Sequence, residues 1–423
     1  MKMFLSLMGA CLVVAPAHAQ TRDWTPQNLV QEALHKNPEI RFYEAEIEAA
    51  RAGRLSAARL SDPVLSMETG AMSIAGQTDG AVWRAEIAQV FDFPGRLALR
   101  KAIADQDITL AELGLEQCKS QLGNQVRALA GDVVLLRRKE AAARSVQERL
   151  RSLIEVLVQR DTGAVSALLE RRILEAALLT STRTLTEAAK EADAASAGLA
   201  VLCGLAPEER LNLADADTAF PEARSLQTLK QQAAKTNFGL QQKRLEVAKQ
   251  GLKVDLTKTE RWGDITFGPY MAGQHAGGTQ IEGGVVFSIP LPLWGKNKGQ
   301  VAAEKARAQQ AEALLAAALR DLERDLAVSR SAYVAELSAL SQWRPESEKE
   351  FRDAATEADR HFRLGAVPAA TYVEMQRGYL EAMDALIESR RSAWKHRMEL
   401  ERLIGSPMKA DEGRSAKAVV QQN

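Results

Sequence analysis

Hydrophobic residues follow two different periods along this chain. In long stretches they recur at steps of three and four, which predicts helices that pack along their length against other helices. One such stripe consists of Leu115, Cys118, Leu122, Val126, Leu129, Val133 and Leu136. Four short stretches instead alternate apolar and polar residues, which predicts strands with one apolar face. The two patterns together predict a mainly α-helical chain with a small β part.

The four alternating stretches lie at about 62–70, 81–93, 263–271 and 281–293. In each of them the odd-numbered positions are mainly apolar, and strands of about 9–11 residues are long enough to cross a membrane. We therefore expect one face of these strands to contact lipid. The residues singled out as lipid-facing are Trp83, Ile87, Phe91, Phe287 and Ile289. The alternative is an ordinary soluble pair of hairpins packed on a helix.

Four strands cannot close a barrel within a bilayer, because their edges would remain unpaired. Closure would require several chains, and three copies would supply twelve strands.

The chain is an internal repeat with a shift of 200 residues. LVQEALHKNPEI at 29–40 aligns with LKQQAAKTNFGL at 229–240, and Gly95 aligns with Gly295. A repeat of this size points to duplication of a domain half. Each half is predicted as a helix (26–60 and 225–259), two strands, a long helix (96–160 and 296–363) and a last helix. The halves span 20–203 and 225–405, with a linker at 204–224 and a disordered tail at 406–423.

The N-terminus has the pattern of an export signal. An apolar run at 4–14 precedes Ala17-His18-Ala19, so residues 1–19 are predicted to be a signal peptide that is cleaved before Gln20. Lipidation of Cys11 is rejected, because the apolar run before it is too short. The mature chain has no run of 18 or more apolar residues that would form a transmembrane helix.

Composition narrows the possible functions. The 423 residues include 55 basic and 55 acidic side chains, and this balance argues against a nucleic-acid partner. Cys118 and Cys203 are the mature cysteines; Cys118 is expected to be buried, and whether the two pair stays open. Neither the cysteines nor the histidines have metal-site spacing, and phosphate-binding and nucleophile motifs are missing. We therefore expect no enzyme activity, no cofactor and no metal site.

Three segments carry a resemblance to a known family. They are LVQEALHKNPEI at 29–40, FPGRLALRKA at 93–102 and SIPLPLWGKNKGQVAAEKARA at 288–308. On the basis of these segments, the chain from about Pro26 to Gly405 resembles the TolC-like outer-membrane efflux channels. The last two segments are most similar to the CzcC-like, cobalt–zinc–cadmium branch.

This resemblance implies a homotrimer in the bacterial outer membrane. Each chain would give four strands to a twelve-stranded β-barrel, and its helices would form a long periplasmic α-helical barrel. The two helix–helix turns would dock onto a periplasmic adaptor, which joins the channel to an inner-membrane pump of RND type. The residues of these turns are Gly163, Ala164, Val165, Gly365, Ala366 and Val367. Glu374 is in register with the family's acidic periplasmic gate, although its companion position is Thr371 and therefore not acidic.

The predicted function is that of a passive exit channel of a tripartite efflux pump for divalent heavy-metal cations or other toxic compounds. One alternative is the exit duct of a type I secretion or multidrug efflux system, which would have the same fold. Another alternative is a periplasmic coiled-coil adaptor, which would lack the duplicated amphipathic strands.

Overall fold

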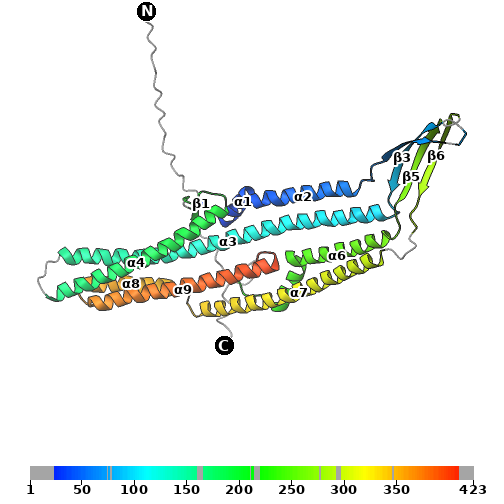
Figure 1. Cartoon of the computed structure of the whole chain (residues 1–423). Coiled ribbons are helices and arrows are strands. Elements are labelled where there is room, and N and C mark those ends of the chain that lie inside the picture. Colours follow the sequence, from blue (N-terminus) through cyan, green and yellow to red (C-terminus); the bar gives the residue numbers. More distant parts are fainter. Residues whose placement is uncertain are drawn as a thin grey trace, which may run out of the picture.

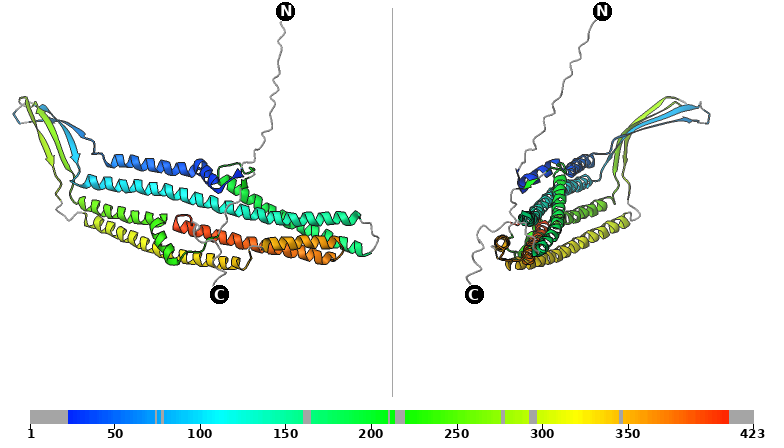
Figure 2. Two further views of the ribbon diagram at one scale, coloured as in Figure 1. Left: turned by 180° about the vertical axis from the view of Figure 1, so that it is seen from behind. Right: turned by 90° about the vertical axis from the view of Figure 1, so that its left-hand side faces the viewer.

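The computed structural model describes residues 23–408, apart from residues 74, 77–78, 160–164, 210, 214–219, 276–277, 292–296 and 345–346. The chain is elongated, with helices side by side along most of its length and a sheet at one end (Figure 1, Figure 2). The predicted mainly helical chain with a small β part is confirmed. The predicted signal peptide 1–19, residues 409–423 of the predicted tail, and Gly163 and Ala164 lie outside the described residues.

Both halves contain two helices, two strands and then long helices, although the first half also begins with a short strand and the second has one more helix at its end. The first half contains β1 (Asp23–Trp24), α1 (Pro26–Lys36), α2 (Pro38–Ala57), β2 (Val64–Met72), β3 (Gly80–Phe91), α3 (Arg96–Gln159) and α4 (Val165–Leu202). The connection between the halves holds β4 (Asn212–Leu213). The second half contains α5 (Leu226–Thr236), α6 (Phe238–Thr259), β5 (Ile265–Gln274), β6 (Gln280–Ser288), α7 (Lys298–Ser341), α8 (Ser347–Arg363) and α9 (Ala369–Ile404).

The first helix predicted for each half is in fact two helices. The structure ends α1 before Asn37 and α5 before Asn237, and a new helix begins at the next residue. The Asn37 side chain accepts a hydrogen bond from the backbone N–H of Glu39 at 2.8 Å, and Asn237 accepts one from Leu240 at 2.8 Å. An asparagine that caps a new helix in this way separates it from the helix before.

The prediction of one continuous long helix at 296–363 is wrong. In the structure α7 ends at Ser341 and α8 begins at Ser347. The sequence carries Pro345 between them, and a proline disfavours helical backbone at the residue before it. The corresponding position of the first half is Ser145, and there α3 runs unbroken for 64 residues, or about 96 Å.

The four long strands form one antiparallel sheet in the order β2-β3-β5-β6. The two hairpins come from different halves of the chain and meet where β3 pairs with β5. Strands β2 and β6 are the edges of this sheet, and neither has a second neighbour among the described residues. A separate two-residue parallel pair joins β1 to β4 near the middle of the helical part.

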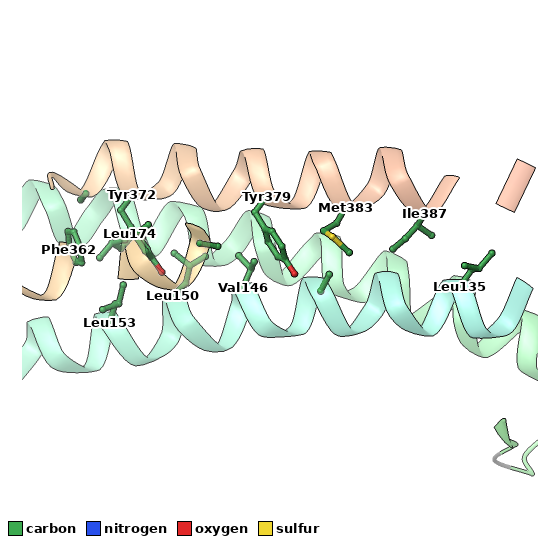
Figure 3. Close-up of a cluster of buried hydrophobic side chains, with 14 residues drawn as sticks. Leu135, Val146, Leu150, Leu153, Leu174, Phe362, Tyr372, Tyr379, Met383 and Ile387 are labelled. Carbon is green, nitrogen blue, oxygen red and sulfur yellow. The ribbon is translucent and has the colours of Figure 1, made fainter. Parts of the chain in front are cut away.

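Most of the apolar core lies between the helices. One cluster fills the space between α3, α4, α8 and α9 at the end of the molecule away from the sheet, where Tyr372, Leu174 and Ile387 are fully buried (Figure 3). Two further clusters lie in the middle of the molecule: one surrounds Trp24 and Leu29, and the other surrounds Leu229 and Tyr333. Among the described residues, none of the helices combines the length and apolarity needed to cross a membrane.

Candidate functional site

One face of the sheet is apolar and exposed. Residues directly opposite each other in neighbouring antiparallel strands lie on the same face, and Leu65 is opposite Ile87 while Phe267 is opposite Phe287. Ile87 is 51% exposed, Phe91 41%, Phe287 65% and Ile289 44%. Their exposure and common facing agree with the alternation in the sequence, and their contact with lipid stays a prediction.

Trp83, the fifth residue predicted to face lipid, is only partly exposed. Its indole lies against the backbone of Gly273, its direct partner on β5. A Cβ atom at Gly273 would come within 2.6 Å of the Trp83 ring, so this packing requires glycine. The side chain of Trp83 on β3 therefore packs against β5, where the two repeats meet.

The opposite face of the sheet is polar. Glu68, Arg84 and Glu282 belong to one cross-strand row, and Glu86 and Tyr270 belong to the next. The Arg84 guanidinium lies 4.3 Å from the centre of the Tyr270 ring and 3.1 Å from a carboxylate oxygen of Glu86. A sheet with one apolar and one charged face separates lipid from water when it curves into a barrel.

The turn between α8 and α9 has the geometry expected for a helix end. Gly365 has a φ of 76°, in the left-handed region that glycine adopts without strain. The backbone N–H of Gly365 donates to the carbonyl of Phe362 at 2.9 Å, and that of Ala366 donates to His361 at 3.0 Å. These two bonds form a Schellman motif. The matching turn of the first half is represented only by Val165, where α4 begins.

Glu374 lies on the exposed side of α9, as Thr371 does, whereas Tyr372 between them and Gln376, two residues after Glu374, are buried. It is not an isolated acid. Arg377 lies one turn later, pairs with Glu381 at 2.8 Å and has its pKa raised, chiefly by that hydrogen bond and in part by Glu374. A gate built from Glu374 would therefore carry an arginine close to each carboxylate.

Cys118 and Cys203 are free and buried. Burial and, to a smaller extent, the nearby Glu32 raise the pKa of the Cys203 thiol to about 11. The described part of the chain contains no group of three or more histidine, cysteine, aspartate or glutamate side chains that could hold a metal ion.

The sequence patterns missed the junction between sheet and helices. Arg96, at the start of α3, is only 8% exposed and is bonded to the loop before β5, more than 160 positions further along the chain. The alternation of apolar residues carries no information about such a contact, because the partners are two carbonyl groups and one aspartate. The signal that could have drawn attention to it is an arginine at the first helical position directly after Pro94-Gly95.

Comparison with solved structures identifies the fold. The chain is similar to the outer-membrane channel OprN (TM-score 0.68, 19% identity, 90% of each chain covered). It is also similar to the outer membrane protein VceC from Vibrio cholerae (TM-score 0.68, 15% identity, 91% of this chain and 97% of that one). A third similar structure is CusC, described in terms of folding and transmembrane channel formation (TM-score 0.69, 14% identity, 91% and 92%).

Comparison of sequences relates one part of the chain to a known family. No curated protein matches the chain significantly. The sequence model of the family described as outer membrane efflux protein matches residues 223–406, which form the second repeat half. The second half of this chain thus matches the outer membrane efflux protein family, and the chain as a whole has the fold seen in OprN and CusC.

Proposed function

We propose that three copies of this chain form a passive exit channel in the bacterial outer membrane. The observation that carries the proposal is the sheet, which exposes an apolar face and whose edge strands each have one neighbouring strand among the described residues. Unpaired backbone groups are too costly in hydrocarbon for such a sheet to lie in a membrane alone. Pairing β6 of one copy with β2 of the next satisfies both edges, and three copies supply twelve strands.

The helices extend this channel into the periplasm. In the proposed trimer the turns at 163–165 and 365–367 lie at the far periplasmic end and dock onto an adaptor that leads to an inner-membrane pump of RND type. The Schellman geometry at Gly365 supports a fixed turn that can present Ala366 and Val367 to a partner. Three copies of Glu374 would form an acidic ring, which favours cations over anions by simple electrostatics.

The substrate class proposed first is divalent heavy-metal cations, which rests on the similarity of 93–102 and 288–308 to the CzcC-like branch. Growth of a strain that lacks the protein tests this on a panel of zinc, cobalt, cadmium, nickel and copper salts beside dyes, detergents and antibiotics. Sensitivity confined to the metals supports the proposal. Sensitivity confined to organic compounds contradicts the proposed metal substrates. It would support the alternative that the same channel serves multidrug efflux or secretion.

The assembly itself is tested by fractionation. The protein should require detergent for extraction and should run on a gel as a trimer that heating converts to the monomer. A periplasmic adaptor or rod without a membrane sheet would instead be released without detergent, and that result would contradict the proposed channel.

A further inference from the structure

The loop between α6 and β5 forms a corner at the helical end of the sheet. Two side chains of this loop, Arg261 and Trp262, are exposed, and the exposed fraction of Trp262 is 44%. The Trp262 ring stacks on Phe93, with ring centres 5.9 Å apart and planes inclined by 12°. The Arg261 guanidinium lies 5.7 Å from the centre of the Trp262 ring, within the range of a cation–π contact.

This corner is held in place from the inside. The buried Arg96 donates to the carbonyl oxygen of Thr259 at 3.1 Å and to that of Trp262 at 2.5 Å, and it pairs with Asp264. Gly263 packs so closely on Pro290 that a Cβ atom there would lie 1.8 Å from the ring. Contacts with Arg96 and with Pro290 thus hold the loop in place. The exposed positions of Arg261 and Trp262 follow from these contacts.

The corner continues the apolar face of the sheet. Ten residues separate Trp83 from Phe93, which corresponds to about 33 Å along a strand and to about 25 Å across a membrane at a tilt of about 40°. The apolar band of an outer-membrane barrel is about 25 Å tall, and aromatic residues border it on both sides. Phe93 and Trp262 therefore lie where the lower border of such a band is expected, next to the periplasmic helices.

An arginine at this position of the corner is present in one half only. Arg261 makes no ion pair with a carboxylate among the residues that the structure describes. The repeat shift of 200 places Ser61 and Asp62 at the corresponding positions of the first half. There the nearest cation, Arg59, already has a carboxylate partner in Asp62, at 3.8 Å.

We propose that Arg261 and Trp262 form an anchor for phospholipid headgroups of the periplasmic leaflet, with the guanidinium on the phosphate and the indole at the border of the acyl chains. A guanidinium matches the geometry of a phosphate group, and an indole is suited to the boundary between water and hydrocarbon. Each trimer has three such anchors, which fix the depth of the sheet in the bilayer. This inference rests on the outer-membrane location proposed above.

The test uses the full-length trimer, purified in detergent and titrated with dioctanoyl-phosphatidylglycerol while the melting of the trimer is followed. The lipid should raise the melting temperature of the wild type. Arg261→Gln should weaken the apparent lipid affinity about fivefold, the change expected from about 1 kcal/mol per basic residue. Arg261→Lys should retain most of the response, whereas Trp262→Leu should reduce it. The control Arg183→Gln removes an exposed arginine of α4, which pairs with Glu187, and should respond as the wild type does.

Two further ligands keep the test independent of any variant. Dioctanoylglycerol lacks the phosphate and inorganic phosphate lacks the chains, so neither should reproduce the stabilisation. An equal effect of either ligand on the wild type, or an unchanged response of Arg261→Gln, overturns the anchor. A wild-type chain that does not enter membranes contradicts the proposed channel instead, so the two failures are distinguishable.

Discussion

Placing a charge on the apolar face of the sheet should prevent the chain from assembling in the membrane. Ile87 lies near the middle of β3, on the same face as Leu65 and Phe287, and about half of its side chain is exposed in the single chain. In the proposed trimer this exposed surface contacts lipid. Ile87→Arg should therefore place a guanidinium near the centre of the hydrocarbon region, and Phe287→Arg should do the same on β6.

The size of the effect follows from the cost of a lipid-facing arginine at the midplane, about 2–4 kcal/mol per chain. This corresponds to a factor of about 30 to about 900 in the insertion equilibrium of each copy. A trimer carries three copies, so the total penalty is about 6–12 kcal/mol, which is comparable to the whole stability of many domains. The variants should be almost absent from the outer-membrane fraction as trimers.

Ser66→Arg is the matched control. Ser66 is one residue from Leu65, the partner of Ile87, but it lies on the polar face opposite Glu86. The added guanidinium would therefore meet water and a carboxylate. The assay is the amount of heat-sensitive trimer in the outer-membrane fraction, normalised to total protein. Normal trimer from Ile87→Arg, or equal loss from Ser66→Arg, would refute the assignment of the two faces.

Three further changes test other parts of the molecule. Gly365→Val forces a β-branched residue into a positive φ at a cost of about 1–2 kcal/mol; it should abolish resistance to the exported compound while trimers persist, and full resistance would remove the docking role of this turn. Glu374→Gln should lower the cation preference of the channel, and an unchanged reversal potential in a salt gradient would make Glu374 an ordinary surface residue. Cys203 should stay protonated at pH 8, because burial raises its pKa to about 11; alkylation of the native trimer should therefore be slow until urea is added, and rapid labelling of the folded protein would contradict its burial.

The sequence predicted the facing of the strands because that property is local. Side chains alternate between the two faces of any strand, so the odd positions that include Ile87 and Phe287 share a side wherever the strands pair. The 200-residue repeat likewise predicted that both halves have one plan. Neither the alternation nor the repeat predicts that β3 pairs with β5, because this pairing depends on how the two halves meet.

The helix boundaries were less predictable. The helical spacing of apolar residues continues through Asn37 and Asn237, so this spacing does not predict that a helix ends there. The features of the sequence that signal the helix end are the capping asparagine and, in the first half, the proline that follows it. Pro345 is a clear breaker, but the strong helical pattern around it concealed the end of α7 at Ser341. The anchor residues at Arg261 and Trp262 became visible only when the loop, Phe93 and Arg96 were seen together.

Recording currents from the purified, detergent-extracted protein in a planar lipid bilayer is the most direct test of the proposed trimeric channel. Uniform single-channel steps from the trimer fraction, with none from the heated monomer, are the expected result. A trimer fraction that inserts without conducting, or a protein that purifies as a detergent-independent monomer, would contradict the proposal that three sheets close into a pore.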